Sequence, residues 1–221
     1  MVCSLPGVAA LRYLARDAAT AGTPLDLSRF RREDGGYVRI EGVPMTIHQY
    51  RSLPEGSGYA YLDGLCFRDS PTVAHQDVAF RVAVLLYACA DSARLGRACQ
   101  QINIWLDERN APVPDACFIL GDCLAHLSND GLHGVAPDLC VEVLSATTER
   151  RDRGRKTELY ARYGCREYWL VDCERQRLEV LRRDGAGRLV LGGVYARGEA
   201  FDSTAGKHSV KCVPNPTDGG P

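Results

Sequence analysis

The clearest structural pattern in the sequence is Pro137-Asp-Leu-Cys-Val-Glu-Val-Leu-Ser145, which is followed along the chain by Glu167-Tyr-Trp-Leu-Val-Asp172. Both are short apolar runs of the kind that is typical of buried strands. The segment from about Asp152 to Tyr163 predicts a helix, because Gly164 stands where a helix commonly ends. A strand, a helix and a second strand in this order predict an α/β protein.

Further elements lie on both sides of this stretch. Apolar residues recur at helical spacing from Val73 to about Ala93, and this predicts a long amphipathic helix. Thr46 can cap a short helix that ends before Pro54. Short apolar runs predict strands, and turn sequences predict hairpins at Asp63-Gly64 and at residues 184–187. The strands are expected at residues 102–106, 116–120, 178–181 and 189–194. This order predicts an α/β sandwich around a mixed sheet.

The two ends of the chain have weaker patterns. Residues 1–44 show no strong period, and Met45 opens the first clear motif, so we expect an N-terminal extension that ends at residue 44. The hypothesis is that the folded domain, and the natural protein itself, starts near Met45. The domain would then span residues 45–211, and the Pro- and Gly-rich residues 212–221 would form a flexible tail.

The composition describes an ordinary globular chain. It has 221 residues, of which 45% are hydrophobic, and 27 basic residues almost cancel 28 acidic ones. This excludes a disordered chain and a polybasic nucleic-acid binder. The charges are nevertheless segregated. Residues 101–147 hold seven acidic and one basic residue, a net charge of -6, and residues 148–166 hold seven basic and three acidic residues, a net charge of +4.

Ten cysteines occur without any Cys-x-x-Cys motif, and several lie in apolar runs. The best metal-like cluster, Cys117, Cys123, His126 and His133, does not have the usual zinc spacing. We therefore expect reduced, mostly buried thiols and a reducing compartment. The N-terminus lacks the basic region of a secretory signal, and no apolar run is long enough for a membrane span, so we expect a cytoplasmic protein.

Three acidic residues stand out by their position. Asp115 and Asp138 each follow a proline at the start of an apolar strand, so we expect both at sheet edges rather than buried. Glu142 lies in the middle of an apolar strand, where a carboxylate needs a cation, a metal or a hydrogen-bond donor. One reading is a salt bridge from Glu142 to an arginine of the next helix. The other is that Glu142 and Asp115 bind a divalent cation, Mg²⁺ or Mn²⁺, because hard oxygen ligands suit these ions.

The predicted helix that follows supplies the opposite charge. Asp152 and Lys156 are four residues apart and share one helix face, and Tyr160 and Tyr163 continue toward the core. Lys156 is close enough along the chain to the strand of Glu142 to direct its ammonium group at a phosphate. Two carboxylates for a metal and one lysine for developing negative charge are the groups that phosphodiester hydrolysis needs.

The same residues closely resemble the bacterial Uma-two family of endonucleases. The resemblance rests on Pro137–Ser145, Arg151–Lys156, Tyr160, Gly164 and Glu167–Asp172. Weaker matches are Met45-Thr-Ile, Leu53-Pro54, Leu62-Asp-Gly64, His75-Gln76 and Pro114-Asp115. It covers roughly residues 45–200. It implies a restriction-endonuclease-like fold, a central mixed sheet flanked by helices, with a variant PD-(D/E)XK nuclease site.

The resemblance also implies roles for individual residues. Asp115 corresponds to the first metal ligand and Glu142 to the second. Leu144 occupies the position of the motif's lysine, so that role passes to Lys156. Asp138 is an alternative ligand or a residue that stabilises a turn.

His75 and Gln76 lie near the position of an acidic residue that the first helix contributes in some relatives. Helix capping or a hydrogen bond to the site is the expected role of either residue. Two departures are Ala60, where relatives commonly carry Glu, and residues 1–44, which match nothing in the family.

These expectations combine into a magnesium-dependent endonuclease that acts on DNA, and a homodimer is plausible because double-strand cleavage usually needs two sites. The alternative is a catalytically inactive protein of the same fold that binds nucleic acid or a protein partner. A purely structural salt-bridge network around Glu142 is a further alternative.

Overall fold

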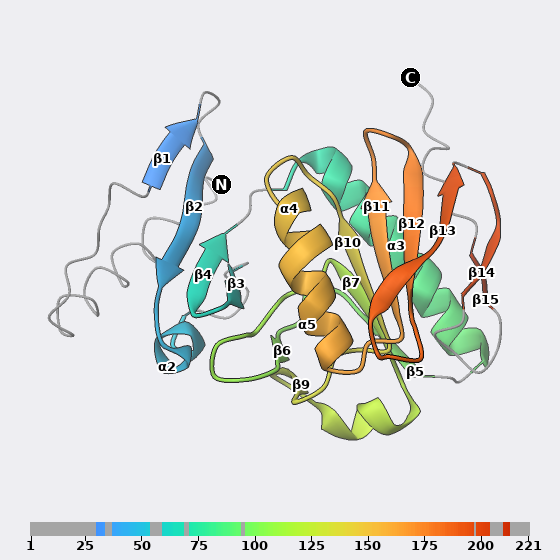
Figure 1. The fold of residues 1–221 in the computed structure, drawn as a ribbon, viewed down its shortest axis with the longest axis horizontal. Coiled ribbons are helices and arrows are strands. Elements are labelled where there is room, and N and C mark those ends of the chain that lie inside the picture. Colours follow the sequence, from blue (N-terminus) through green and yellow to red (C-terminus); the bar gives the residue numbers. More distant parts are fainter. Residues whose placement is uncertain are drawn as a thin grey trace, which may run out of the picture. The chain divides into compact units, whose positions relative to one another are not determined.

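The structure is a computed structural model, and it describes residues 30–33, 37–53, 59–68, 71–93, 96–196, 198–203 and 210–212. The chain divides into two compact units. Unit 1 comprises Met1–Ser70 with Glu108–Asn110, and unit 2 comprises Pro71–Asp107 with Ala111–Pro221. Figure 1 shows the elements of both units. No helix in the described ranges is long and apolar enough to cross a membrane.

Within its described residues, unit 1 contains a four-stranded antiparallel sheet and the short helix α2. The sheet has the order β1-β2-β4-β3, from Phe30–Glu33, Tyr37–Pro44, Leu65–Arg68 and Tyr59–Leu62. Helix α2 (Ile47–Arg51) begins at Thr46, which forms a reciprocal capping box with Gln49. The predicted cap is therefore confirmed.

The hairpin predicted at Asp63-Gly64 is also confirmed. Both turn residues have positive φ, 55° and 81°, as a tight two-residue hairpin turn requires. Strands β1 and β2 lie within residues 1–44, where no regular element was predicted. Antiparallel pairing of β2 with β4 forms this part of the sheet, and a local period could not show it. The domain boundary at residue 45 stays a prediction, and residues 1–29 and 213–221 lie outside the described ranges.

Unit 2 is built on a six-stranded mixed sheet, as the sequence predicted. Its order is β13-β12-β11-β10-β7-β5, and only β10 and β11 run parallel. The strands are β5 (Gly96–Cys99), β7 (Ala116–Leu120), β10 (Leu139–Val143), β11 (Glu167–Asp172), β12 (Arg177–Arg183) and β13 (Leu189–Ala196).

Helices cover both faces of this sheet (Figure 1). Helix α3 (Val73–Ala93), which was predicted with these bounds, lies behind the sheet in the view of Figure 1 and packs its apolar side on it. The core on this face includes Val82 and Leu86 of the helix and Phe118, Val141 and Trp169 of the strands.

The helical segment on the other face differs from the prediction. It lies in front of the sheet in Figure 1 and consists of α4 (Glu149–Arg151), a π-helical turn η3 (Asp152–Lys156) and α5 (Thr157–Arg162). The prediction of one regular helix from about Asp152 to Tyr163 was therefore wrong in detail. The helix begins three residues earlier and contains a wider turn.

Two strand predictions in unit 2 need correction. Residues 102–106 form only the two-residue strand β6 (Ile104–Trp105), which pairs with β9 (Gly131–His133) outside the central sheet. Strand β5 was not predicted, because its residues are not β-branched or aromatic, and pairing with β7 defines it. The remaining elements are η2 (Gly121–His126), β8 (Leu127–Ser128), β14 (Phe201–Ser203) and β15 (Val210–Cys212).

Candidate functional site

Asp115 and Glu142 lie near each other in unit 2, Asp115 directly before β7 and Glu142 within β10. The paired register of these two antiparallel strands ends at Ala116 opposite Val141. The backbone N–H of Asp115 also donates to the carbonyl of Val141 at 3.1 Å, which departs from that register. The negative charge of Asp115 raises the pKa of Glu142, so the two carboxylates are close enough to interact. The two carboxylates that the sequence singled out are therefore brought together.

The carboxylate of Glu142 is buried in a polar cluster. One oxygen, Oε2, lies 2.8 Å from Lys156 Nζ, and Tyr160 donates its hydroxyl to the other, Oε1, at 3.0 Å. Lys156 Nζ also lies 2.9 Å from Asp152 Oδ1. We call Glu142, Asp152 and Lys156 the buried ion cluster, because at most 7% of each side chain is exposed.

Charge is unevenly balanced at this place. Burial raises the pKa of Glu142 well above its usual value, and Asp152 and Asp115 raise it further, whereas Lys156 lowers it. Burial by itself would lower the pKa of Lys156, but the carboxylates of Asp152 and Glu142 outweigh it and raise that pKa. Three carboxyl groups thus face one ammonium group, and an added cation would relieve the excess of negative charge.

The carboxylate of Asp115 has one contact at each of its two oxygens. Its Oδ2 accepts from the backbone N–H of Val143 at 2.8 Å, and its Oδ1 lies 3.1 Å from His75 Nε2. The hydrogen bond to the site that was one expected role of His75 is confirmed. Gln76 belongs to the first turn of α3, where its backbone N–H donates to the carbonyl of Thr72.

Asp138 lies at the other end of the same strand pair. It is buried, with 2% exposed, so its expected place at an exposed sheet edge was wrong. Its Oδ2 accepts from the backbone N–H of Leu120 at 2.7 Å, and its Oδ1 lies 3.2 Å from Arg166 Nε. Because β7 and β10 are antiparallel, Asp138 joins the end of β7, far along the strand from Asp115. The geometry therefore supports the structural reading of Asp138.

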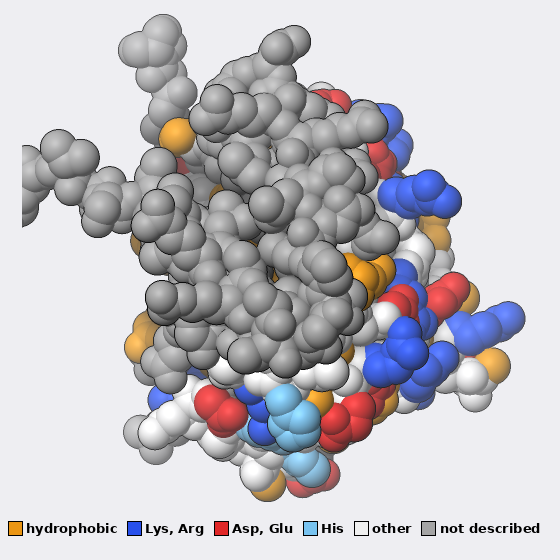
Figure 2. Space-filling model, turned by 90° about the vertical axis from the view of Figure 1, so that its left-hand side faces the viewer, with side chains coloured by type: hydrophobic (Ala, Val, Ile, Leu, Met, Phe, Trp, Pro, Cys, Tyr) orange, Lys and Arg blue, Asp and Glu red, His pale blue; other side chains and the backbone are white. Residues whose placement is uncertain are grey.

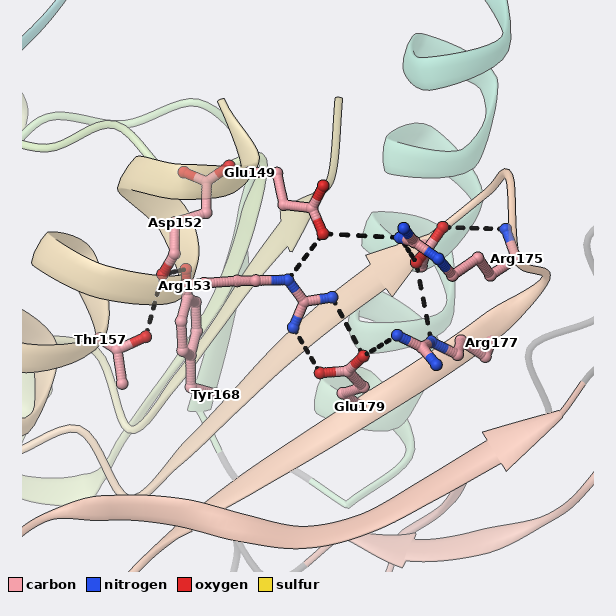
Figure 3. Close-up of polar contacts among 9 residues, drawn as sticks. Glu149, Asp152, Arg153, Thr157, Tyr168, Arg175, Arg177 and Glu179 are labelled. Carbon is pink, nitrogen blue, oxygen red and sulfur yellow. Dashed lines mark hydrogen bonds and ion pairs between the residues drawn. The ribbon is translucent and has the colours of Figure 1, made fainter. Parts of the chain in front are cut away.

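The π-helical turn carries both Asp152 and Lys156, and Figure 3 shows the contacts of Asp152. The backbone carbonyl of Asp152 accepts hydrogen bonds from Thr157 Oγ1 at 2.9 Å and from Tyr168 Oη at 3.1 Å. The hydroxyls thus satisfy a carbonyl at the wide turn. Such turns are frequent at functional sites.

Arg153, in the same turn, does not contact Glu142. Its guanidinium group is shared between Glu149 at 2.8 Å and Glu179, whose two oxygens lie at 2.5 and 3.0 Å (Figure 3). The predicted salt bridge from Glu142 to an arginine of this helix was therefore wrong, since Lys156 takes that place.

We call the seven Lys and Arg residues within 148–166 the basic block. Four of them lie in salt bridges with carboxylates of unit 2. Arg155 lies 3.6 Å from Glu158, and Arg166 pairs with Asp138. Figure 2 shows Lys and Arg side chains interspersed with Asp and Glu on the visible face. The block is a mixed-charge surface and not a continuous basic patch.

Sequence reasoning did not assign a contact to the tyrosines near the cluster. Tyr160 follows Lys156 by four residues, and this spacing was the signal that placed it on the same face. Tyr163, which has the next matching position, instead donates to Asp107 at 2.6 Å.

The ligand chemistry of this site suits a hard divalent cation. In the described part of the chain, no group of three or more His, Cys, Asp or Glu side chains is arranged to hold a metal. Magnesium, however, usually keeps several waters and needs only one or two carboxylates from the protein. By ligand type Asp115 and Glu142 are such a pair, but each of their four oxygens already has a protein partner, which an ion would have to displace or share.

Comparisons with known proteins agree with the fold. The model of the Uma2 family, described as "Putative restriction endonuclease", matches residues 47–208. A solved structure from Anabaena variabilis ATCC 29413, described as "a putative nuclease belonging to DUF820", aligns with a TM-score of 0.60. The alignment covers 73% of this chain and 90% of that chain at 18% identity. This likeness shows that the fold is restriction-endonuclease-like. No curated protein matches the sequence.

Proposed function

The chain belongs to the Uma2 family, and on this basis we propose that it is a metal-dependent endonuclease that hydrolyses phosphodiester bonds of DNA. The observation that carries the proposal is the proximity of the Asp115 and Glu142 carboxylates, with Lys156 on the Glu142 carboxylate. These three residues would form the active site.

Asp115 and Glu142 would hold Mg²⁺ or Mn²⁺. When bound, the ion would polarise the phosphate and lower the pKa of a water molecule that attacks phosphorus. His75 and the backbone of Val143 fix the orientation of Asp115 for this task. Tyr160 does the same for Glu142.

Lys156 would contribute the positive charge. In the absence of a metal its ammonium group is shared by Glu142 and Asp152. Once Glu142 serves as a ligand, Asp152 would keep Lys156 in place, and the lysine would stabilise the negative charge that develops on the phosphate. This role requires no continuous basic surface.

The alternative function is that of a catalytically inactive relative that binds nucleic acid or a protein partner. The closed contacts of the buried ion cluster favour it, because both oxygens of Glu142 already have partners. Opening these contacts costs free energy, which metal binding would have to supply.

Cleavage of supercoiled plasmid DNA tests the proposal. We expect the wild type to nick or linearise the plasmid with Mg²⁺ or Mn²⁺ but not with EDTA. Glu142→Gln should reduce the rate by at least about a hundredfold, the order of loss for a group that stabilises transition-state charge. Glu158→Gln, on exposed α5 surface, is the matched control and should cleave normally. Equal background from all three proteins would support the inactive alternative. An RNA substrate of the same sequence tests the preference for DNA.

Two further properties belong to the same proposal. We propose a homodimer, because cleavage of both strands of DNA commonly uses two active sites, and light scattering of the purified protein measures the mass. We also propose a reducing compartment such as the cytoplasm. The eight cysteines with described side-chain environments are all free thiols, which supports it.

A further inference from the structure

Three cysteines form a row across the sheet of unit 2. Cys99 on β5 lies directly opposite Cys117 on β7, and Cys117 lies directly opposite Cys140 on β10. Opposite residues share one face of a sheet, so the three thiols lie on the same face. Cys117 and Cys140 are fully buried, and Cys99 on the edge strand is half-buried. Cys99 is therefore the member of the row that solvent can reach.

The geometry of Cys99 and Cys117 suits a disulfide. Directly opposite residues in an antiparallel pair have Cα atoms roughly 4.5–5.5 Å apart. Disulfides span Cα separations of roughly 4.4–6.8 Å. The register of Cys99 and Cys117 therefore meets the Cα separation that a disulfide needs.

The neighbouring thiol of Cys117 is the main cause that lowers the pKa of Cys99 to about 7. Partial burial opposes the shift, and nearby Arg97 adds to it. A thiolate is the reactive form of cysteine, so Cys99 is the nucleophile of the pair at neutral pH.

We propose that Cys99 and Cys117 are an oxidisable thiol pair, in which a peroxide oxidises Cys99 and Cys117 then closes a cross-strand disulfide. In the first step the sulfur of Cys99 attacks one peroxide oxygen, the O–O bond breaks, and a water molecule leaves after proton uptake. In the second step the sulfur of Cys117 attacks that of Cys99, the S–O bond breaks, and a second water leaves. Two thiols lose two electrons and two protons, and one hydrogen peroxide becomes two waters.

The disulfide would join the edge strand to the strand that Asp115 precedes. Cys117 follows Asp115 by two residues and lies on the same side of its strand. The inference itself does not depend on the proposed nuclease activity, and its test measures no cleavage.

Oxidation of the full-length protein by hydrogen peroxide, followed by mass spectrometry, tests the pair. Cys3→Ser and Cys212→Ser are introduced first, so that only thiols of described environment remain. We expect the protein to lose two hydrogen atoms, and dithiothreitol to restore them. Digestion before aspartates separates the peptides of Cys117, Cys123 and Cys140, so the linked pair is identified directly.

Three variants make the result decisive. Cys99→Ser should abolish the disulfide and leave Cys117 reduced, whereas Cys173→Ser, at another half-buried cysteine, should leave the disulfide intact. Cys117→Ala keeps a small apolar side chain in the core, and dimedone should then trap Cys99 as a sulfenic acid. Any of three results would overturn the proposal. They are a disulfide between Cys117 and Cys140, a Cys99 that stays unmodified, and oxidation of Cys99 to sulfonic acid without a disulfide.

Discussion

Asp115 and Asp138 have the same local sequence and the same backbone task, and the residues around them separate their roles. Each follows a proline and accepts a hydrogen bond from the N–H at the end of the opposite strand. Asp115 lies near Glu142 and contacts His75, whereas Asp138 is closed off by Arg166. A metal site therefore needs a second acidic residue across the strand.

Replacement of Lys156 tests how tightly the buried ion cluster is coupled. Lys156→Met would leave Glu142 and Asp152 buried without their cation, and we expect a loss of about 3–5 kcal/mol in the free energy of unfolding. Urea denaturation measures it. Adding Glu142→Gln to this variant should recover part of the loss, because one buried charge is then removed. Arg150→Met on the exposed surface is the control, and an equal cost for both lysine and arginine variants would contradict the coupling.

The sequence predicted which residues meet at the site better than it predicted their partners. Lys156 reaches Glu142 because its helical segment follows β10 after a short connection, and Asp115 lies near β10 because it directly precedes the neighbouring strand β7. A salt bridge from Glu142 to an arginine was one of two readings, but Arg153 pairs with Glu149 and Glu179. Glu179 lies on β12, two strands away from Glu142, and no local pattern reports a contact across that distance.

At the scale of elements, the π-helical turn is the feature that brings Asp152 and Lys156 onto the sheet. Gly164 predicted where a regular helix ends, and it carries no information on a wider turn at Asp152–Lys156. Its stabilising contacts come from hydroxyls of Thr157 and Tyr168, and Tyr168 lies in a different element. Edge strand β5 was missed for a related reason, since its pairing and not its composition defines it.

Removal of these hydroxyls tests whether they hold the turn. Tyr168→Phe and Thr157→Val should each lower the free energy of unfolding by about 1 kcal/mol, the usual net value of one hydrogen bond. The double variant should lose more than the sum, because the carbonyl of Asp152 is then buried without either donor. Tyr163→Phe, whose hydroxyl bonds at an exposed position, is the matched control with a smaller effect. Additive losses would show that another donor satisfies the carbonyl.

At the scale of the whole chain, the near-zero net charge is an average over groups that neutralise one another locally. Along the sequence, residues 101–147 carry a net charge of -6 and residues 148–166 a net charge of +4. In the structure, Glu149, Glu158 and Glu179 neutralise the arginines of the helical segment within its own surroundings. The sequence showed the segregation of charge along the chain, but pairing in three dimensions removed most of it.

This pairing predicts how stability depends on pH. The hydrogen bond from Arg153 is the main cause that lowers the pKa of Glu179 below its usual 4.5, although burial opposes it. A carboxylate with a lowered pKa stabilises the fold above its unfolded pKa, and this contribution is lost as pH falls through the folded value. We expect Glu179→Gln to cost about 1 kcal/mol at pH 7 and less as the pH falls through the lowered pKa of Glu179, where the wild type becomes protonated too. Thermal unfolding between pH 3 and 7 measures this difference in stability. If the stability of the variant runs parallel to that of the wild type over this range, the ion pair of Glu179 is not the cause of the pH dependence.

The central claim is that Asp115 and Glu142 share one divalent ion, and anomalous diffraction from a crystal soaked in Mn²⁺ tests it most directly. We predict one manganese peak within bonding distance of both carboxylates, with Lys156 still held by Asp152. The peak should vanish in Glu142→Gln crystals and persist in Glu158→Gln crystals. Wild-type crystals without this peak, in which Glu142 keeps its contacts with Lys156 and Tyr160, would contradict the claim and leave the structural role of the cluster as the explanation.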